Sequence, residues 1–121
     1  MKGSQAKILE KSRPQTSVLD YSREELVALL REKLAAHPDV VQAFLHGSVA
    51  GGRAGAWSDL DLIIVARTAE PFIERARAFF NILEIGIPAD ILVYTPDEFA
   101  AMRALTTGFW KGFRENHIQL V

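Results

Sequence analysis

The sequence predicts an α/β (α+β) fold, with a mixed β-sheet and helices packed on it. Three apolar segments of strand length, residues 40–46, 60–66 and 89–94, alternate with segments whose apolar residues repeat at helical spacing. Two of the helical segments open with a hydroxyl residue followed three positions later by glutamate, the pattern of a capping box. Because a helix connects the second and third strands, these two strands should run parallel.

Length and composition indicate one globular domain. The 121 residues are 49% hydrophobic and include no cysteine, which excludes a disulfide framework and a thiolate metal site. We expect residues 1–20 to form a mobile N-terminal tail and residues 21–121 a single domain. No apolar run reaches the length of a membrane span and no secretory signal is visible, so we expect a cytoplasmic protein without membrane contact.

The charge balance gives little support for a nucleic-acid substrate. The formal net charge is −1, and the basic residues are scattered apart from a mild cluster near the N-terminus. A domain that grips a nucleic-acid backbone usually carries a basic excess or stripe. We therefore do not expect nucleic acid as a direct substrate.

The first predicted helix begins after Ser22, with Glu25 completing the capping box, and ends before Pro38. Its buried stripe contains leucines at helical spacing: Leu26, Leu29, Leu30 and Leu34. The first strand follows at residues 40–46. It ends in Gly47 and Ser48, a pair that allows a sharp turn and a close approach of ligand to backbone.

The second strand opens with two carboxylates. Asp59 and Asp61 are two positions apart, so in extended backbone their side chains point to the same face. Gly47 ends one strand and Asp59 begins the next, so these points meet only if the two strands run antiparallel. The connection between them is rich in small residues, includes Arg53 and Ser58, and is long enough to allow this.

The second predicted helix opens at Pro71, in the first helical position, and ends before Gly86. Its apolar residues at helical spacing predict the buried face: Phe72, Ala76, Phe79, Phe80 and Leu83. The third strand, residues 89–94, returns parallel to the second strand. Asp90 should therefore stand beside Asp59 and Asp61 at the same end of the sheet.

The C-terminal part begins with a helix from the capping box at Thr95 and Glu98 to about Leu105. Aromatic side chains then crowd a short segment: Phe109, Trp110 and Phe113. They either pack on the end of the sheet or form an exposed patch for a partner. Residues 117–121 predict a short closing strand.

This combination of residues indicates chemistry on phosphates. Paired carboxylates at an apolar strand repel one another and resist burial, and a divalent cation removes that conflict. Mg²⁺ commonly takes one or two carboxylates together with substrate phosphates. Backbone N–H groups of the Gly47–Ser48 turn, with the serine hydroxyl, can hold a phosphate. Together these features predict a metal-bound nucleoside triphosphate, whereas either feature alone would favour an ordinary turn.

The stretch resembles the signature of the polymerase-β-type nucleotidyltransferase superfamily, in which Gly-Ser is followed about ten residues later by Asp-x-Asp. The register is similar to that of its small prokaryotic branch, the minimal nucleotidyltransferases (MNT), at Gly47, Ser48, Ala50, Gly52, Ser58, Asp59 and Asp61. The family loop often reads GSRARG, whereas Val49 and Gly51 replace its arginines here. Arg53 is the nearest substitute.

The resemblance implies nucleotidyl transfer from ATP or another nucleoside triphosphate to a hydroxyl, assisted by two Mg²⁺ ions or by Mn²⁺. It implies that Asp59, Asp61 and Asp90 are the catalytic residues and metal ligands. Gly47, Ser48, Arg53 and Ser58 would bind the nucleotide. MNT proteins are typically encoded beside a HEPN-domain protein, and characterised pairs are toxin–antitoxin systems in which the MNT attaches AMP to its partner. The resemblance therefore implies AMPylation of a HEPN partner.

Two alternatives stay open at this point. The domain could be a non-catalytic nucleotide-binding module that neutralises a HEPN partner by contact, a reading that the altered GSVAGG loop supports. It could also transfer a nucleotide to a small molecule, with the acceptor site completed by a homo-oligomer. The sequence gives neither the acceptor nor the base preference.

Overall fold

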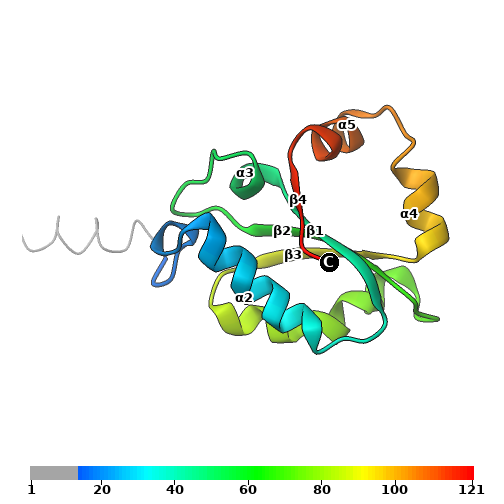
Figure 1. The fold of residues 1–121 in the computed structure, drawn as a ribbon, viewed down its shortest axis with the longest axis horizontal. Helices are drawn as coiled ribbons and strands as arrows, with labels where there is room; N and C mark the ends of the chain where they lie inside the picture. The colour runs from blue at the N-terminus through cyan, green and yellow to red at the C-terminus, as the bar shows by residue number, and fades with distance from the viewer. Residues whose placement is uncertain (1–13) are drawn as a thin grey trace, which may run out of the picture.

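The computed structural model describes residues 14–121 (Figure 1); the rest of the predicted tail, residues 1–13, lies outside the described residues. The elements follow in the order η1 (Val18–Asp20), α2 (Arg23–Ala35), β1 (Val40–His46), α3 (Gly47–Ala50), β2 (Leu60–Ala66), η2 (Phe72–Ile85), β3 (Ala89–Tyr94), α4 (Pro96–Met102), α5 (Gly108–Glu115) and β4 (His117–Gln119). Segments η1 and η2 are 3₁₀-helical.

The four strands form one mixed sheet in the order β3-β2-β1-β4. Strand β1 runs antiparallel to both β2 and β4, whereas β2 and β3 are parallel. The predicted α/β class, the antiparallel first pair and the parallel return are thus confirmed. The closing strand is also present, as β4.

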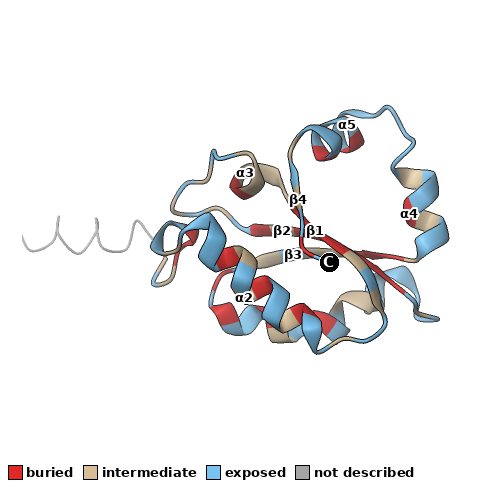
Figure 2. Ribbon diagram, viewed as in Figure 1, coloured by how far each residue is buried: buried red, intermediate tan, exposed pale blue. Residues whose placement is uncertain are grey.

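The sheet is covered on both faces, with α2 and η2 on one side and α4 and α5 on the other (Figure 1). The larger core lies under α2 and η2, where Leu30, Ile82 and the strand residue Leu62 are fully buried. The second core is largely aromatic and joins Phe44 of β1 to the α4 and α5 helices. Figure 2 shows buried residues on the helix faces turned toward the strands. Central strand β2 is consequently buried on both faces beyond its first residues.

Helix α2 begins as the sequence predicts. The Ser22 hydroxyl accepts a hydrogen bond from the Glu25 N–H, and the Glu25 carboxylate accepts one from the Ser22 N–H. This reciprocal pairing satisfies two donors at the helix N-terminus. Leu26, Leu30 and Leu34 are buried against the sheet, and Leu29 lies at the margin of the same core.

The predicted second helix differs from the observed segment η2. The buried residues are Phe79, Ile82 and Ile85, whereas Phe80 is 55% exposed and Leu83 is 44% exposed. A 3₁₀ helix has three residues per turn, so positions i, i+3 and i+6 share a face, and a 3.6-residue period selects the wrong set. Phe72 is also exposed, and Pro71 precedes the helix in extended backbone (φ −58°, ψ 145°) instead of opening it.

The C-terminal aromatic residues separate into two groups. Trp110 is 5% exposed and Phe113 is 2% exposed, because the inner face of α5 packs on Phe44 and Phe99. Phe109 lies on the outer side and is 47% exposed. Of the two alternatives left open by the sequence, packing against the sheet holds for Trp110 and Phe113, and among these three residues Phe109 alone keeps an exposed ring.

Part of the predicted N-terminal tail lies against the domain. Val18 and Ser17 are buried, and Val18 belongs to the larger core. Ser17 caps η1, with its own capping box to Asp20. Within residues 14–121, every helix is too short or too polar to span a membrane.

Candidate functional site

The predicted carboxylates meet at one end of the sheet. Asp61 of β2 stands opposite Asp90 of the parallel strand β3, and opposite His46 of β1 on its other side. His46 in turn stands opposite His117 of β4. Because directly paired residues of neighbouring strands project to the same face, these four side chains form a row across the sheet. We call this set the polar row.

The polar row lies on the face that α4 and α5 cover. The aromatic core beneath those helices begins two positions away from the row on three of these strands. The residues there are Phe44 of β1, Ile63 of β2 and Leu92 of β3, and each shares a face with the row residue of its strand. The side chains therefore change from polar to apolar along the same face. The polar row marks the place where the packed core ends and solvent can enter.

Gly47 forms the turn beside Asp61, in the left-handed region with φ 73°. A Cβ atom at this position would overlap the Asp61 carboxylate and stand 3.0 Å from its Cγ. Two independent reasons thus require glycine, namely the backbone conformation and the close approach of the carboxylate. Gly47 is also the first residue of the short helix α3, and its carbonyl accepts a hydrogen bond from the Gly51 N–H at 3.0 Å.

Ser48 and Ser58 connect the two ends of the loop. The Ser48 hydroxyl donates to Ser58 Oγ at 3.3 Å, and the Gly55 N–H donates to the same oxygen at 2.8 Å. The loop that precedes Asp59 is thereby tied to the turn that follows β1. The sequence predicts that the two segments meet, although it does not predict these hydrogen bonds.

Arg53 lies over the turn. Its N–H donates to the Ser48 carbonyl at 2.8 Å, and its Nη2 atom would stand 3.4 Å from a Cβ atom placed on Gly51. The guanidinium group thus occupies the space beside the position where the family loop often carries an arginine. Arg53 also lines the cavity above Asp61.

Like charges and partial burial define the electrostatics of the row. Burial raises the pKa of the Asp61 carboxyl, and the neighbouring Asp90 and Asp59 carboxylates raise it further. Burial lowers the pKa of the His46 imidazole, and His117 lowers it further, whereas Asp90 opposes this effect. The ionised form of Asp61 is therefore disfavoured until a positive charge reaches it.

A hollow of about 370 Å³ opens above the polar row. Its lining combines three residues of the row with the Gly47 turn and the site-facing side of α5: His46, Gly47, Arg53, Asp61, Asp90, Gly108, Phe109, Gly112, Phe113 and Asn116. Among the residues predicted for the site, Gly47, Arg53, Asp61 and Asp90 line this hollow. Ser48, Ser58 and Asp59 do not, although Asp59 is near enough to affect the pKa of Asp61.

The contribution of α5 to this hollow was missed from the sequence. Gly108, Gly112 and Asn116 recur at intervals of four and lie on one side of a helix, which is a signal that could have been read. The pairing of β4 with β1 brings this helix to the site, and a three-residue strand gives almost no sequence signal. The ring of His46 contacts Phe109 with centroids 5.6 Å apart.

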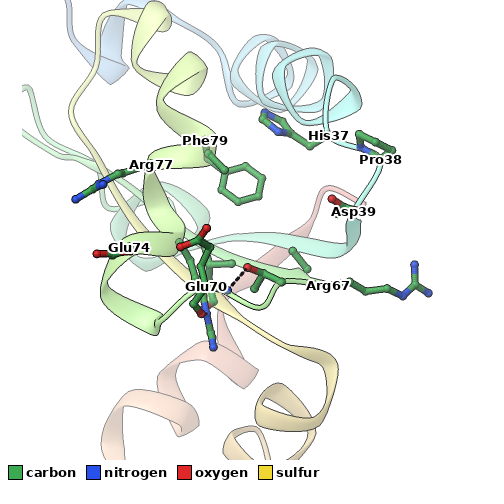
Figure 3. Close-up of a pocket in the computed structure, with 13 residues that line it drawn as sticks. His37, Pro38, Asp39, Arg67, Glu70, Glu74, Arg77 and Phe79 are labelled. Atoms are coloured by element: carbon green, nitrogen blue, oxygen red, sulfur yellow. Dashed lines mark hydrogen bonds between the residues drawn. The ribbon is translucent and has the colours of Figure 1, made fainter.

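A second cavity, of about 270 Å³, lies at the opposite end of the sheet between the start of β1 and η2 (Figure 3). It contains none of the predicted site residues. Two of its polar side chains already have partners outside the lining, as His37 Nε2 lies 2.9 Å from Asn81 Oδ1 and Arg75 forms an ion pair with Glu98. We therefore place the candidate site at the polar row.

The comparison with family models identifies the class. Residues 29–108, more than half of the chain, match the model described as "Polymerase beta, Nucleotidyltransferase". The chain belongs to this family, as the resemblance predicted, and membership supports transferase activity. A search of the curated proteins gave no significant match.

Two solved structures with a similar fold are described as toxin–antitoxin proteins. One, described as a toxin–antitoxin with AMP-PNP, has a TM-score of 0.53 at 19% identity. The match covers 84% of this chain and 73% of the chain in that structure. Another, the toxin–antitoxin MntA-HepT, has a TM-score of 0.50 at 15% identity. The match covers 79% of this chain and 69% of the chain in that structure. At these identities the likeness shows the fold.

Proposed function

We propose that this protein transfers AMP from ATP to a hydroxyl group of a protein partner, as the antitoxin of a HEPN/MNT pair. The observation that carries the proposal is the polar row beside the Gly47 turn, where Asp61 and Asp90 stand level on neighbouring strands. Family membership and the likeness to toxin–antitoxin structures support the same reading.

The donor set fits a divalent cation. Asp59, Asp61 and Asp90 supply hard carboxylate oxygens, and their mutual repulsion favours a cation between them. No group of three or more His, Asp or Glu side chains is close enough to hold a metal alone within residues 14–121. Substrate phosphates and water would complete the coordination, which is the usual arrangement for Mg²⁺. Bound Mg²⁺ would supply charge neutralisation at the phosphates.

The nucleotide would lie between the Gly47 turn and the carboxylates. The main chain of Gly47 and the Ser48 hydroxyl would hold the β- and γ-phosphates, and Arg53 would add the positive charge of the family arginines. When the Ser48 hydroxyl donates to a phosphate, the Ser58 hydroxyl would donate to Ser48 Oγ in turn and keep it in place, while the Gly55 N–H donates to Ser58 Oγ. This arrangement leaves the α-phosphate near Asp61.

The reaction would then be a single displacement. The acceptor oxygen bonds to the α-phosphorus, the bond from that phosphorus to the bridging oxygen of the β-phosphate breaks, and pyrophosphate leaves with the electron pair. Asp90, at the open edge strand, would accept the proton from the acceptor hydroxyl. Positioning and charge neutralisation would supply most of the catalysis.

The acceptor is proposed to be a side chain of another protein. The hollow above the polar row is open to solvent, and Phe109 at its rim keeps an exposed ring. Bulk water at an activated phosphate would cause hydrolysis, so a partner that covers the hollow would protect the reaction.

Mass spectrometry of the protein co-expressed with its neighbouring HEPN gene product tests the proposal. We expect the partner to gain one AMP or more, and the Asp61→Asn variant to abolish this gain. Calorimetry should show ATP binding that strengthens greatly on addition of Mg²⁺. Equal ATP binding in excess chelator, or added mass that survives Asp61→Asn, would contradict the catalytic assignment.

The alternative of a non-catalytic binding module has its own support. The loop lacks the family arginines at Val49 and Gly51, and the carboxylates form no ready-made metal cage in the described part of the chain. If Asp61→Asn binds the partner and protects cells as the parent does, with no added mass in either case, the binding module is correct.

A further inference from the structure

Residues 14–18 form a strap that crosses the domain beside the candidate site. Ser17 is 1% exposed and is the one buried polar residue in the described part of the chain. Its hydroxyl donates to the carbonyl of Ala56 at 2.8 Å and accepts a hydrogen bond from the Leu19 N–H at 3.2 Å. The first bond spans 39 positions of sequence. It joins the strap to the loop that carries Ser58 and Asp59.

The strap also touches the turn before β3. The side chain of Thr16 lies against Gly86, where a Cβ atom would stand 3.4 Å from Thr16 Oγ1 and 3.5 Å from its Cβ and Cγ2. A small hollow of about 70 Å³ separates the strap from both loops, and it is lined by Pro14, Thr16, Ala56, Trp57, Ser58, Asp59, Ile87 and Pro88. One short segment therefore contacts two loops that are about thirty residues apart in the sequence.

These two loops lead directly into the strands that carry the carboxylates. Ala56 lies three residues before Asp59, and Pro88 lies two residues before Asp90. The loops also meet each other, since the Leu60 N–H donates to the Pro88 carbonyl at 2.9 Å. Movement of either loop would displace a carboxylate of the candidate site relative to the others.

We propose that the strap is a clamp, in which Ser17 and Thr16 fix the loop before β2 and the turn before β3 and so set the spacing of Asp59 and Asp90. Ser17 is a positioning residue in this proposal, since its hydroxyl acts through the main chain of Ala56. The catalytic consequence rests on the proposed nucleotidyl transfer, whereas the clamp itself does not.

Hydrogen exchange on the full chain tests the clamp without any need for activity. In Ser17→Ala we expect faster exchange of the amides of residues 55–60 and 86–90, with unchanged exchange in α4 and α5. Ser22→Ala is the matched control, because Ser22 also caps a helix through a capping box but bonds to no distant loop. Unchanged exchange at residues 55–60 in Ser17→Ala, or an equal increase there in Ser22→Ala, would overturn the clamp.

Thr16→Ala provides a second variant in case Ser17→Ala does not fold. It removes the Oγ1 and Cγ2 atoms that lie against Gly86 and leaves the Ser17 hydrogen bonds intact. We expect faster exchange at residues 86–90, with a smaller effect at residues 55–60. No change at residues 86–90 would show that the strap does not restrain this turn.

Transfer kinetics test the catalytic consequence. Ser17→Ala should lower kcat for AMP transfer by about tenfold to a hundredfold, because a displacement of the order of 1 Å can have that effect. The KM for ATP should change by less than about threefold, since the Gly47 turn and Arg53 remain in place. An unchanged kcat in a variant with faster exchange would show that the clamp does not align the carboxylates. A parent without transfer activity would refute the proposed function, and the exchange data would still decide the clamp.

Discussion

At the scale of residues, Asp61 combines partial burial with two neighbouring carboxylates, and both conditions raise the pKa of its carboxyl. Its ionised form therefore opposes folding in the absence of a cation. We expect Asp61→Asn to abolish transfer and to keep or raise the melting temperature of the metal-free protein. We expect the same of Asp59→Asn, whose carboxylate contributes to the repulsion. A large drop in melting temperature in both variants would make these residues structural.

Because folding raises the pKa of the Asp61 carboxyl, the free energy of unfolding should depend on pH. In the unfolded chain, the Asp61 carboxyl loses its proton as pH rises through its ordinary pKa of 3.8. In the folded chain the pKa is raised, so the same carboxyl loses its proton only at a higher pH. Its protonated form therefore favours the folded state in acid, and that contribution is lost as pH rises through the raised pKa. Denaturant unfolding should show the advantage of Asp61→Asn over the parent growing through this window. Glu115→Gln, an exposed change of equal charge, is the control.

Gly47 tests the close approach between the turn and Asp61. Gly47→Ala should destabilise the fold by at least the cost of a left-handed residue, about 1–2 kcal/mol, and should displace the Asp61 carboxylate. Gly55→Ala is the matched control in the same loop, since a Cβ atom there meets nothing within 4 Å. Equal unfolding free energies for the two variants, measured in urea, would contradict this account.

Much of the site was predictable at this scale because its signals are local. A Gly-Ser turn at a strand end and two aspartates at a strand start each have a short-range physical meaning. The position of Asp90 required one further rule, the parallel return of a strand after a helix. The hydrogen bond between Ser48 and Ser58 was not predictable, because it depends on the path of the intervening loop.

At the scale of elements, η2 shows how a helical pattern can mislead. The segment contains two helical stretches that meet at Phe79, where φ −109° and ψ 17° depart from helical geometry. Apolar residues occupy nine of its 14 positions, so they fit a period of 3.0 and a period of 3.6 almost equally well. Packing against α2 and the sheet determines which of these residues are buried, and the local sequence pattern does not predict it.

Two truncations distinguish these periods. Ile82→Ala removes a fully buried side chain and should cost about 2–5 kcal/mol of unfolding free energy. Phe80→Ala removes a larger but 55% exposed ring, and it should cost less than about 1 kcal/mol. Urea denaturation of both variants measures the difference. A greater loss in Phe80→Ala would mean that η2 presents the face predicted from the α-helical spacing.

At the scale of the whole molecule, the site joins segments from both ends of the chain. Strand β4 pairs with β1 and holds α5 above the polar row, while the strap at residues 14–18 lies beside the loops that lead into β2 and β3. Neither arrangement was predicted. Short elements such as β4 and η1 owe their positions to long-range contacts, for which the local sequence provides little evidence.

The aromatic residues of α5 provide a test of how the molecule meets a partner. If a protein covers the hollow, Phe109→Ala should raise the Kd of the complex about tenfold or more, because exposed aromatic residues are frequent interface anchors. The stability of the free protein should change little, since the ring is half-exposed. Trp110→Ala should instead destabilise the free protein by about 3–5 kcal/mol through loss of a buried side chain.

Ile73→Ala is the matched control for Phe109→Ala. Ile73 is 87% exposed and lies on η2, which covers the other face of the sheet from α5. Calorimetric titration of each folded variant with the HEPN protein should show a weakened complex for Phe109→Ala and an unchanged one for Ile73→Ala. The reverse result would place the partner on η2, away from the polar row. Such a partner could not present a hydroxyl to the candidate site, and contact without transfer would then be the function that the structure supports.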